Sequence, residues 1–336
     1  MMKAIAPGKI ILSGEHAVVC GQPALAFAVD RYATASVIPH ASPATIVFDL
    51  LNLKHHKDTT VKALKRFKSR LSLNYHAFLQ GELGIKDVLK LPHELSHFAL
   101  SNFLERFNRF SDGGIHLKTE STIPMGCGMG SSAAMILAVK FALAHHFKEN
   151  IDKEHLFQLA LETENLQHGY SSGLDLRVSL QGGALEYCNG LFEPFIIPQW
   201  PLYMVNTGSP ESTTGECVLH TQSVFEKSTL AEEIGAVTKA LKNAVVQECF
   251  SDFQQAIRHN HRLLTALDVV PSNIQDFIHF IEQQGVAAKI CGAGSIRGNK
   301  AGVVLIASEA DPQLWCQSFG FTVEKITGDS HGLRLG

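Results

Sequence analysis

The sequence lacks several features by which whole classes of protein are recognised. It contains no run of about 18 uninterrupted apolar residues, so no transmembrane helix is expected. Residues 1–9 do not form a charged and then apolar leader that ends at small residues, so no secretory signal is expected. Neither sign of charge dominates, because 29 Lys and Arg face 32 Asp and Glu for a net charge of −3. This balance argues against a basic nucleic-acid-binding protein. We therefore predict a cytoplasmic protein with neither a membrane nor a nucleic-acid partner.

Disulfide and zinc spacings are also missing. The seven cysteines are odd in number, widely scattered and contain no CxxC pair, so we expect free thiols in a reducing compartment. The 17 histidines form neither an HExxH motif nor a paired Cys/His spacing, so no zinc site is predicted. What the chain does have is a globular composition, with 336 residues, 45% hydrophobic and 18% charged. That is enough for one large or two ordinary domains and excludes a mainly disordered chain.

Hydrophobic periodicity predicts an α+β fold, because strands and helices follow one another without a regular βαβ order. The expected strands are 3–12, 24–37, 44–50, 114–120, 182–187, 201–206, 287–291 and 302–307. The expected helices are 61–79, 94–110, 131–147, 152–167, 230–249, 253–267 and 272–284. A shift in composition near 209–214 predicts two domains, residues 1–210 and 211–336.

Two of these expected helices have a distinctive surface. The helix at 131–147 is apolar on nearly every side, so it should be central and buried. The helix at 61–79 carries five basic residues, which a solvated face explains more simply than an anion site. These residues are Lys62, Lys65, Arg66, Lys68 and Arg70.

The strongest local motif is a glycine-rich segment between an expected strand and an expected helix. Alternating glycines allow backbone N–H groups to approach a phosphate, and the helix start adds free N–H groups and a positive dipole end. The alternative is a tight turn without a ligand. Serines rather than Lys-Ser follow the last glycine, so this is not a Walker A loop, and no dinucleotide-binding unit follows it. The candidate phosphate-binding residues are Pro124, Gly126, Gly128, Gly130, Ser131, Ser132 and Ala133.

Two further polar positions stand out. Asp175 follows Gly169-Tyr-Ser-Ser-Gly173, which fits the G-x-S-x-G pattern of serine hydrolases. Helical periodicity precedes Gly169, whereas that pattern needs a strand, so a hydrolase is not predicted and Asp175 is either a base or a helix cap. Lys9 lies on an apolar strand, where a lysine usually faces solvent, but it would also suit charge stabilisation at a phosphoryl group.

Three segments in this order resemble the motifs of the GHMP superfamily of small-molecule kinases, which includes galactokinase, homoserine kinase, mevalonate kinase and phosphomevalonate kinase. They are Pro7-Gly8-Lys9, residues 124–133, and Gly292-Ala293-Gly294. Within the superfamily the chain looks most like the mevalonate kinases. That likeness is carried by residues 14–21, 164–169, 172–175, 182–183 and 260–264.

The resemblance implies a two-domain fold, an N-terminal α+β domain and a C-terminal ferredoxin-like domain with the site between them. It also implies that a last strand near 333–335 returns to the first domain. The implied reaction is ATP-dependent phosphorylation of a small-molecule hydroxyl with Mg²⁺, with (R)-mevalonate becoming 5-phosphomevalonate in isoprenoid biosynthesis. A homodimer is compatible with it. A kinase for another hydroxy acid or a sugar, and a catalytically silent sensor on the same fold, are the alternatives.

Residue roles follow from the same resemblance. Asp175 matches the family's catalytic carboxylate, and Lys9 would lie beside it and orient the substrate hydroxyl. Ser132 and Glu164 match the family's Mg²⁺ ligands. The substrate side would be formed by Glu15, His16, Gly292 and Ala293. Retention of Lys9, Ser132, Glu164 and Asp175 together disfavours the sensor, since binding alone requires no base.

Two departures from the family pattern carry charge. The third motif continues with Arg297 and Lys300 where the family has glycines, so these side chains could reach the phosphates. Arg177, just after Asp175, is either a surface charge or a bidentate partner for a substrate carboxylate.

Overall fold

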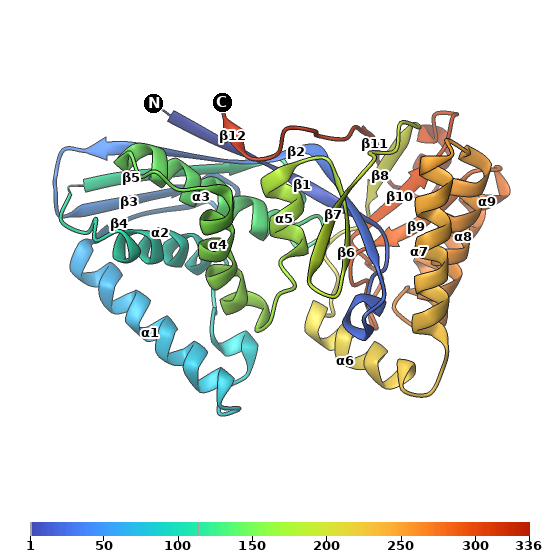
Figure 1. The fold of residues 1–336 in the computed structure, drawn as a ribbon, viewed down its shortest axis with the longest axis horizontal. Helices are drawn as coiled ribbons and strands as arrows, with labels where there is room; N and C mark the ends of the chain where they lie inside the picture. The colour runs from blue at the N-terminus through green and yellow to red at the C-terminus, as the bar shows by residue number, and fades with distance from the viewer. Residues whose placement is uncertain (1, 113) are drawn as a thin grey trace.

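The computed structural model of this chain describes residues 2–112 and 114–336, which fold around two β-sheets (Figure 1). The larger sheet has the strand order β12-β1-β2-β5-β3-β4, and β6 pairs with both β2 and β7. Its strands are β1 (Met2–Ser13), β2 (Ala24–His40), β3 (Thr45–Leu50), β4 (His55–Thr60), β5 (Gly114–Ser121), β6 (Ala184–Cys188), β7 (Leu191–Phe195) and β12 (Arg334–Leu335).

The smaller sheet is antiparallel, with the order β11-β8-β10-β9. Its strands are β8 (Leu202–Asn206), β9 (Ala287–Cys291), β10 (Val303–Ala307) and β11 (Val323–Ile326). Three helices, α7 (Leu230–Val246), α8 (Phe250–Ala266) and α9 (Ser272–Gln283), lie beside it (Figure 1). Because β8 precedes residue 211, this sheet already begins before the predicted boundary, and the division at 210/211 stays a prediction.

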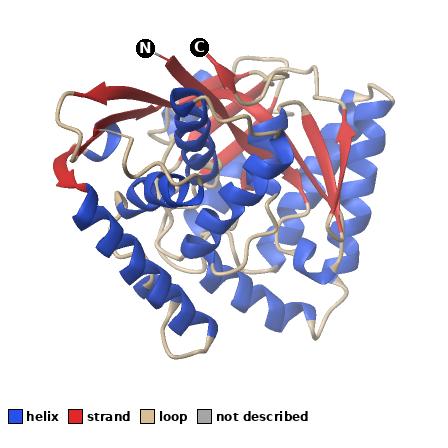
Figure 2. Ribbon diagram, turned by 60° about the vertical axis from the view of Figure 1, so that its left-hand side comes forward, coloured by secondary structure: helices blue, strands red, loops and turns tan. Residues whose placement is uncertain are grey.

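The helices that precede β6 lie on one side of the larger sheet, as the labels of Figure 1 and the turned view of Figure 2 show. They are α1 (Val61–Leu79), α2 (Glu94–Arg106), α3 (Ser131–Phe147), α4 (Lys153–His168) and α5 (Leu174–Gln181). The central helix is α3, which contacts β1, β2, α2, α4 and α5. Leu137 and Leu143 on it have no exposed surface, so the prediction of a buried central helix is confirmed. Burying each such leucine is worth about 1.5–3 kcal/mol.

Local sequence explains where several elements begin. Asp152 accepts a hydrogen bond from the backbone N–H of His155 at 2.7 Å and so caps α4. Thr213 and Glu216 form a capping box at the start of α6 (Thr214–Phe225), a helix that the sequence pattern did not predict. The short polar strand β4, the short α5 and the exposed β7 were missed as well, because none has enough apolar periodicity. The remaining elements are η1 (Ala17–Cys20), η2 (Leu51–Leu53), η3 (Ile85–Asp87) and α10 (Gln313–Ser318).

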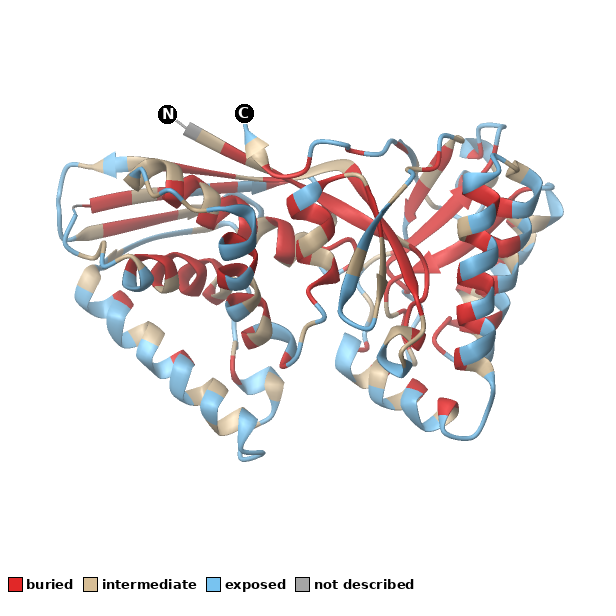
Figure 3. Cartoon of the chain, viewed as in Figure 1, coloured by how far each residue is buried: buried red, intermediate tan, exposed pale blue. Residues whose placement is uncertain are grey.

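Strand β1 joins the two halves of the molecule. At its start it pairs with β12, with Ala4 opposite Leu335, so the C-terminal strand lies in the larger sheet and the two ends of the chain are neighbours (Figure 1). Further along, β1 contacts α7, α8 and β9. Figure 3 shows buried residues continuing along β1 and β2 from one half into the other. The residues just after β1 therefore lie where the two halves meet. None of the described helices is long and apolar enough to cross a membrane.

Candidate active site

The glycine-rich segment between β5 and α3 is folded by its glycines. Gly126, Gly128 and Gly130 have φ values of +70°, +82° and +68°, which residues with a side chain rarely adopt. A Cβ on Gly128 would lie 2.8 Å from the carbonyl oxygen of Cys291 at the end of β9. The segment also accepts a hydrogen bond at Cys127 O from the N–H of Val303 in β10, at 3.2 Å. Because Val303 pairs with Cys291, the segment is fixed against two adjacent strands of the smaller sheet.

The start of α3 offers unused hydrogen-bond donors. Its N-cap is Gly130, which supplies no side chain, and the first turn contains no acidic residue. The backbone N–H groups of Ser131, Ser132 and Ala133 thus lack the side-chain cap that a helix start normally has. Ser131 and Ser132 are half-buried, Ala133 is buried, and the half-buried Pro124 opens the segment. Free N–H groups at the positive end of a buried helix suit an anion such as a phosphate.

Lys9 and Asp175 come together beside this helix start. Lys9 Nζ lies 3.1 Å from Asp175 Oδ1 and donates to the carbonyl oxygen of Gly128 at 3.0 Å. Its side chain is 3% exposed and that of Asp175 is 32% exposed. The solvent-facing alternative for Lys9 is therefore wrong. The helix-cap alternative for Asp175 is also wrong, because the N-cap of α5 is Gly173.

Glu164 lies on α4, close enough to Asp175 for the negative charge of Asp175 to affect it. It is 2% exposed, and its Oε2 accepts a hydrogen bond from the hydroxyl of Ser171 at 2.8 Å. Burial, and secondly the negative charge of Asp175, raise the pKa of Glu164 to about 8. Ser171 had no predicted role, although its place in the serine-rich turn before Asp175 was visible in the sequence.

The donor set of Ser132 and Glu164 fits Mg²⁺. Hydroxyl and carboxylate oxygens are the ligands that this ion prefers. A dication would offset the burial and the repulsion from Asp175 that raise the pKa of Glu164. In the described part of the chain, no group of three or more His, Cys, Asp or Glu residues could hold a metal. Phosphate oxygens would have to complete the coordination, as is usual for Mg²⁺ bound with a nucleotide.

Glu15 forms a buried ion pair that sequence reasoning missed. Its partner is Lys289 of β9, and both side chains are at most 1% exposed. Lys289 also donates to the carbonyl oxygens of Ile11 and Leu12, at 3.3 and 3.1 Å. A lone lysine inside the apolar run 287–291 was the available indication, because a buried charge needs a partner. Oε2 of Glu15 is buried and has no hydrogen-bond partner among the described residues.

His16, in the segment 14–21 that follows the first motif, contacts the third motif. Its Nε2 lies 3.0 Å from the carbonyl oxygen of Ala293, and its Nδ1 lies 3.3 Å from Thr221 Oγ1. Burial lowers the pKa of His16 to about 4, so the ring is neutral near pH 7. A Cβ on Gly292 would lie 3.1 Å from Cα of Gly128, so the third motif also packs on the second. The structure thus brings all three motifs into contact.

The charged residues that depart from the family pattern contact other parts of the protein. Arg297 Nη2 lies 3.0 Å from Glu216 Oε1 on α6 and 3.1 Å from Oε2. Arg177 binds both carboxylate oxygens of Glu154, at 2.7 and 3.1 Å, and its guanidinium lies 3.7 Å from the ring centre of Phe157. The Arg177 side chain is 12% exposed, so it is a packed structural cation rather than a surface charge or a free substrate ligand. The aliphatic part of the Lys300 side chain packs against Gly208.

Comparisons with known proteins support the fold and the family resemblance. The family described as GHMP kinases N terminal domain matches residues 94–183. A mevalonate kinase from Thermococcus onnurineus is 30% identical over 87% of this chain and 86% of its own length. One from Archaeoglobus fulgidus is 32% identical over 87% of this chain and 89% of its own. The crystal structure of the Methanococcus jannaschii mevalonate kinase superposes with a TM-score of 0.81, at 21% identity, over 97% of this chain and 98% of that one.

Proposed function

Because the chain belongs to the GHMP kinases and is an ATP-dependent kinase acting on a hydroxyl, we propose that it converts (R)-mevalonate to 5-phosphomevalonate. The observation that carries the proposal is the ion pair between Lys9 and Asp175 beside the uncapped start of α3. The choice of mevalonate is supported by the two relatives at 30% and 32% identity, both named mevalonate kinase. As a mevalonate kinase, the protein would act in isoprenoid biosynthesis.

In this proposal the backbone of residues 126–132 binds the ATP phosphates. Phosphoryl transfer spreads negative charge over oxygen atoms, so a protein accelerates it mainly by positioning and by electrostatic stabilisation. The N–H groups at the start of α3 are fixed in place by the contacts of the glycine segment with β9 and β10, so they need no reorganisation when charge develops. Ser132 and Glu164 would hold Mg²⁺, which when bound neutralises charge on the phosphates.

Asp175 and Lys9 act at the substrate hydroxyl. Asp175 is partly exposed, so its carboxylate is accessible to accept a hydrogen bond, and then the proton, from the attacking hydroxyl. Lys9 is anchored through Gly128 O and presents its ammonium to both the carboxylate and the incoming phosphoryl oxygens. The remaining wall of the substrate site is assigned to Glu15, His16, Gly292 and Ala293. The contacts of Glu15 with Lys289 and of His16 with Ala293 hold that wall rigid.

A substrate panel tests the proposal. The purified protein is incubated with Mg-ATP and, in turn, (R)-mevalonate, phosphomevalonate, homoserine and galactose, with ADP release followed by a coupled assay and the product identified by ³¹P NMR. We expect kcat/KM for mevalonate to exceed that for the other three by at least about 100-fold. A larger kcat/KM for galactose or homoserine would assign the chain to that substrate instead. ATP binding without turnover of any alcohol would favour the sensor.

A further inference from the structure

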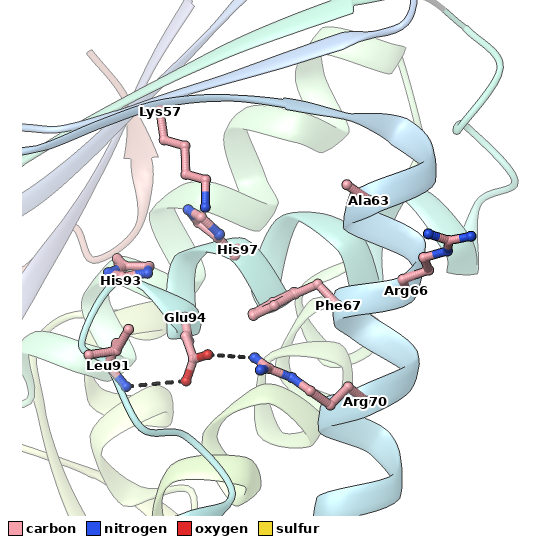
Figure 4. Close-up of a pocket in the computed structure, with 9 residues that line it drawn as sticks. All are labelled: Lys57, Ala63, Arg66, Phe67, Arg70, Leu91, His93, Glu94 and His97. Atoms are coloured by element: carbon pink, nitrogen blue, oxygen red, sulfur yellow. Dashed lines mark hydrogen bonds and ion pairs between the residues drawn. The ribbon is translucent and has the colours of Figure 1, made fainter.

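A cavity lies away from the candidate active site, on the larger sheet. It has a volume of about 440 Å³ and is bounded by β4, α1 and the start of α2 (Figure 4). None of its lining residues belongs to the three kinase motifs. A volume of this size lies within the range of about 300–1,000 Å³ that is usual for small-molecule sites.

The cavity carries excess positive charge. Lys57 extends from β4 toward the ring of His97, and Arg66 lies at the rim with its guanidinium turned outward (Figure 4). Neither cation has an ion-pair partner among the residues that the structure describes. Arg70 is neutralised, because its Nη2 lies 2.7 Å from Oε1 of Glu94. The two unpaired cations therefore leave the cavity attractive to an anion with two negative charges.

The one carboxylate that lines the cavity is already paired. Glu94 is 5% exposed, and its Oε2 accepts hydrogen bonds from the backbone N–H groups of Lys90 and Leu91, at 2.7 and 3.2 Å. Arg70 on Oε1 already balances the negative charge of this side chain, so Glu94 does not neutralise Lys57. The acidic residue thus does not cancel the attraction for an anion.

A buried imidazole adds an unused polar group. His97 is 6% exposed, and its Nε2 has no hydrogen-bond partner in the described part of the chain. Its ring is held in place by stacking on Phe48, with ring centres 3.7 Å apart. Burial, with smaller effects from nearby charges that include Lys57, lowers the pKa of His97 to about 3, so the ring is neutral and can donate or accept one hydrogen bond. A buried polar atom without a partner is rare and is often satisfied by a bound molecule.

The cavity also has an apolar side. Phe67 of α1 lines it, and Leu91 lines it while being 52% exposed, which is high for a leucine. A free inorganic ion would leave both side chains uncovered. A ligand with an apolar part would bury them, at about 25 cal/mol for each Å² removed from water.

We propose that this cavity binds a small organic phosphate, with the phosphate beside Lys57 and His97 and the apolar part against Phe67 and Leu91. Arg66 swings inward from the rim to complete the charge of the site. The phosphate takes the two positive charges and the free imidazole nitrogen, and the apolar part distinguishes the ligand from inorganic phosphate. The site goes beyond the proposed kinase reaction and does not depend on it.

Calorimetry with phenyl phosphate tests the proposal. The nucleotide site of the full chain is first saturated with Mg²⁺ and a non-hydrolysable ATP analogue, so that the probe cannot bind there. We expect one saturable site for phenyl phosphate and binding at least about tenfold weaker for inorganic phosphate, because only the former covers Phe67 and Leu91. Lys57→Gln should weaken the binding of phenyl phosphate by about tenfold or more, as loss of a charge-assisted hydrogen bond does.

The matched control is Lys62→Gln, the same substitution on an exposed position of α1 that does not line this cavity. It should bind phenyl phosphate as the parent does. The ring-nitrogen NMR signals of His97 should shift on titration, which locates the site. The proposal is overturned if phenyl phosphate shows no saturable binding at millimolar concentration. It is equally overturned by equal weakening in both lysine variants, by equal affinity for inorganic phosphate, or by unchanged His97 signals during binding.

Discussion

Replacement of Asp175 by Asn is the most informative single change in this protein. The substitution keeps the shape and one acceptor oxygen but removes the negative charge that lies 3.1 Å from Lys9 Nζ. Asn can neither accept the proton of the substrate hydroxyl nor balance the ammonium. Positioned general bases typically contribute 10²–10⁴-fold to a rate, so we expect kcat to fall by at least about 10²-fold.

The distance between Lys9 and Asp175 also determines how far Asp175→Asn should lower the free energy of unfolding. Two unit charges 3.1 Å apart attract each other by about 5 kcal/mol at an effective dielectric constant of about 20, which is an upper bound. Asp175 is 32% exposed, so water screens much of this attraction, and the amide oxygen of Asn can still accept a hydrogen bond from Lys9. We therefore expect a loss of about 1–2 kcal/mol in the free energy of unfolding, too little to unfold a protein of ordinary stability.

The assay compares kcat and the ATP dissociation constant of Asp175→Asn with those of Asp152→Asn. Asp152 caps α4, where Asn serves almost as well as Asp, so this control should keep kcat within about twofold. ATP binding should change little in either variant, because the proposal assigns the phosphates to the backbone of the glycine segment. A folded Asp175→Asn protein with near-parental turnover would refute the catalytic assignment of Asp175.

Three further changes probe the surrounding groups. Glu164→Gln should raise the Mg²⁺ requirement for turnover. The folded-state pKa of Glu164, about 8, lies above its ordinary value of 4.5, so its stabilising contribution is complete below pH 4.5 and is lost as the pH rises through about 8. Without Mg²⁺, thermal melts should therefore show the parent losing stability relative to Glu164→Gln between pH 5 and 8, and parallel melts would contradict the assignment of this shift. Arg297→Ala should leave the KM for ATP within about twofold, since Arg297 pairs with Glu216; a large rise would place this arginine at the phosphates instead. Arg177→Ala should lower the free energy of unfolding by about 1–3 kcal/mol, because the contacts with Glu154 and a phenylalanine ring are lost. Both kcat and KM should stay unchanged. An altered KM for the alcohol would instead show that Arg177 contacts the substrate.

Much of the fold could be predicted because the relevant properties are local. The predicted helices at 61–79 and 131–147 coincide with α1 and α3, and the predicted strand at 287–291 coincides with β9. Apolar periodicity over such lengths depends on each segment alone. Elements without that periodicity, such as the polar β4 and the capped α6, are stabilised by their neighbours and could not be found in this way.

The sequence by itself determined the chemistry that needs particular residue types at fixed spacing. Glycine adopts the positive φ values at 126, 128 and 130 more readily than any other residue, so the candidate phosphate-binding segment was visible without a structure. Lys9 and Asp175 were visible as polar residues within or beside otherwise regular segments. The family resemblance was carried by the order of the three motifs along the chain.

Only the tertiary structure decided which charges meet. Lys289 and Glu15 are 274 residues apart, and nothing in either segment specifies the other as its partner. The same holds for His16 and Ala293, which are 277 residues apart. Arg297 pairs with Glu216 on α6, a helix that hydrophobic periodicity did not predict. A buried charge is stable only with a partner, and the identity of that partner depends on how two sheets pack, a property that no local pattern contains.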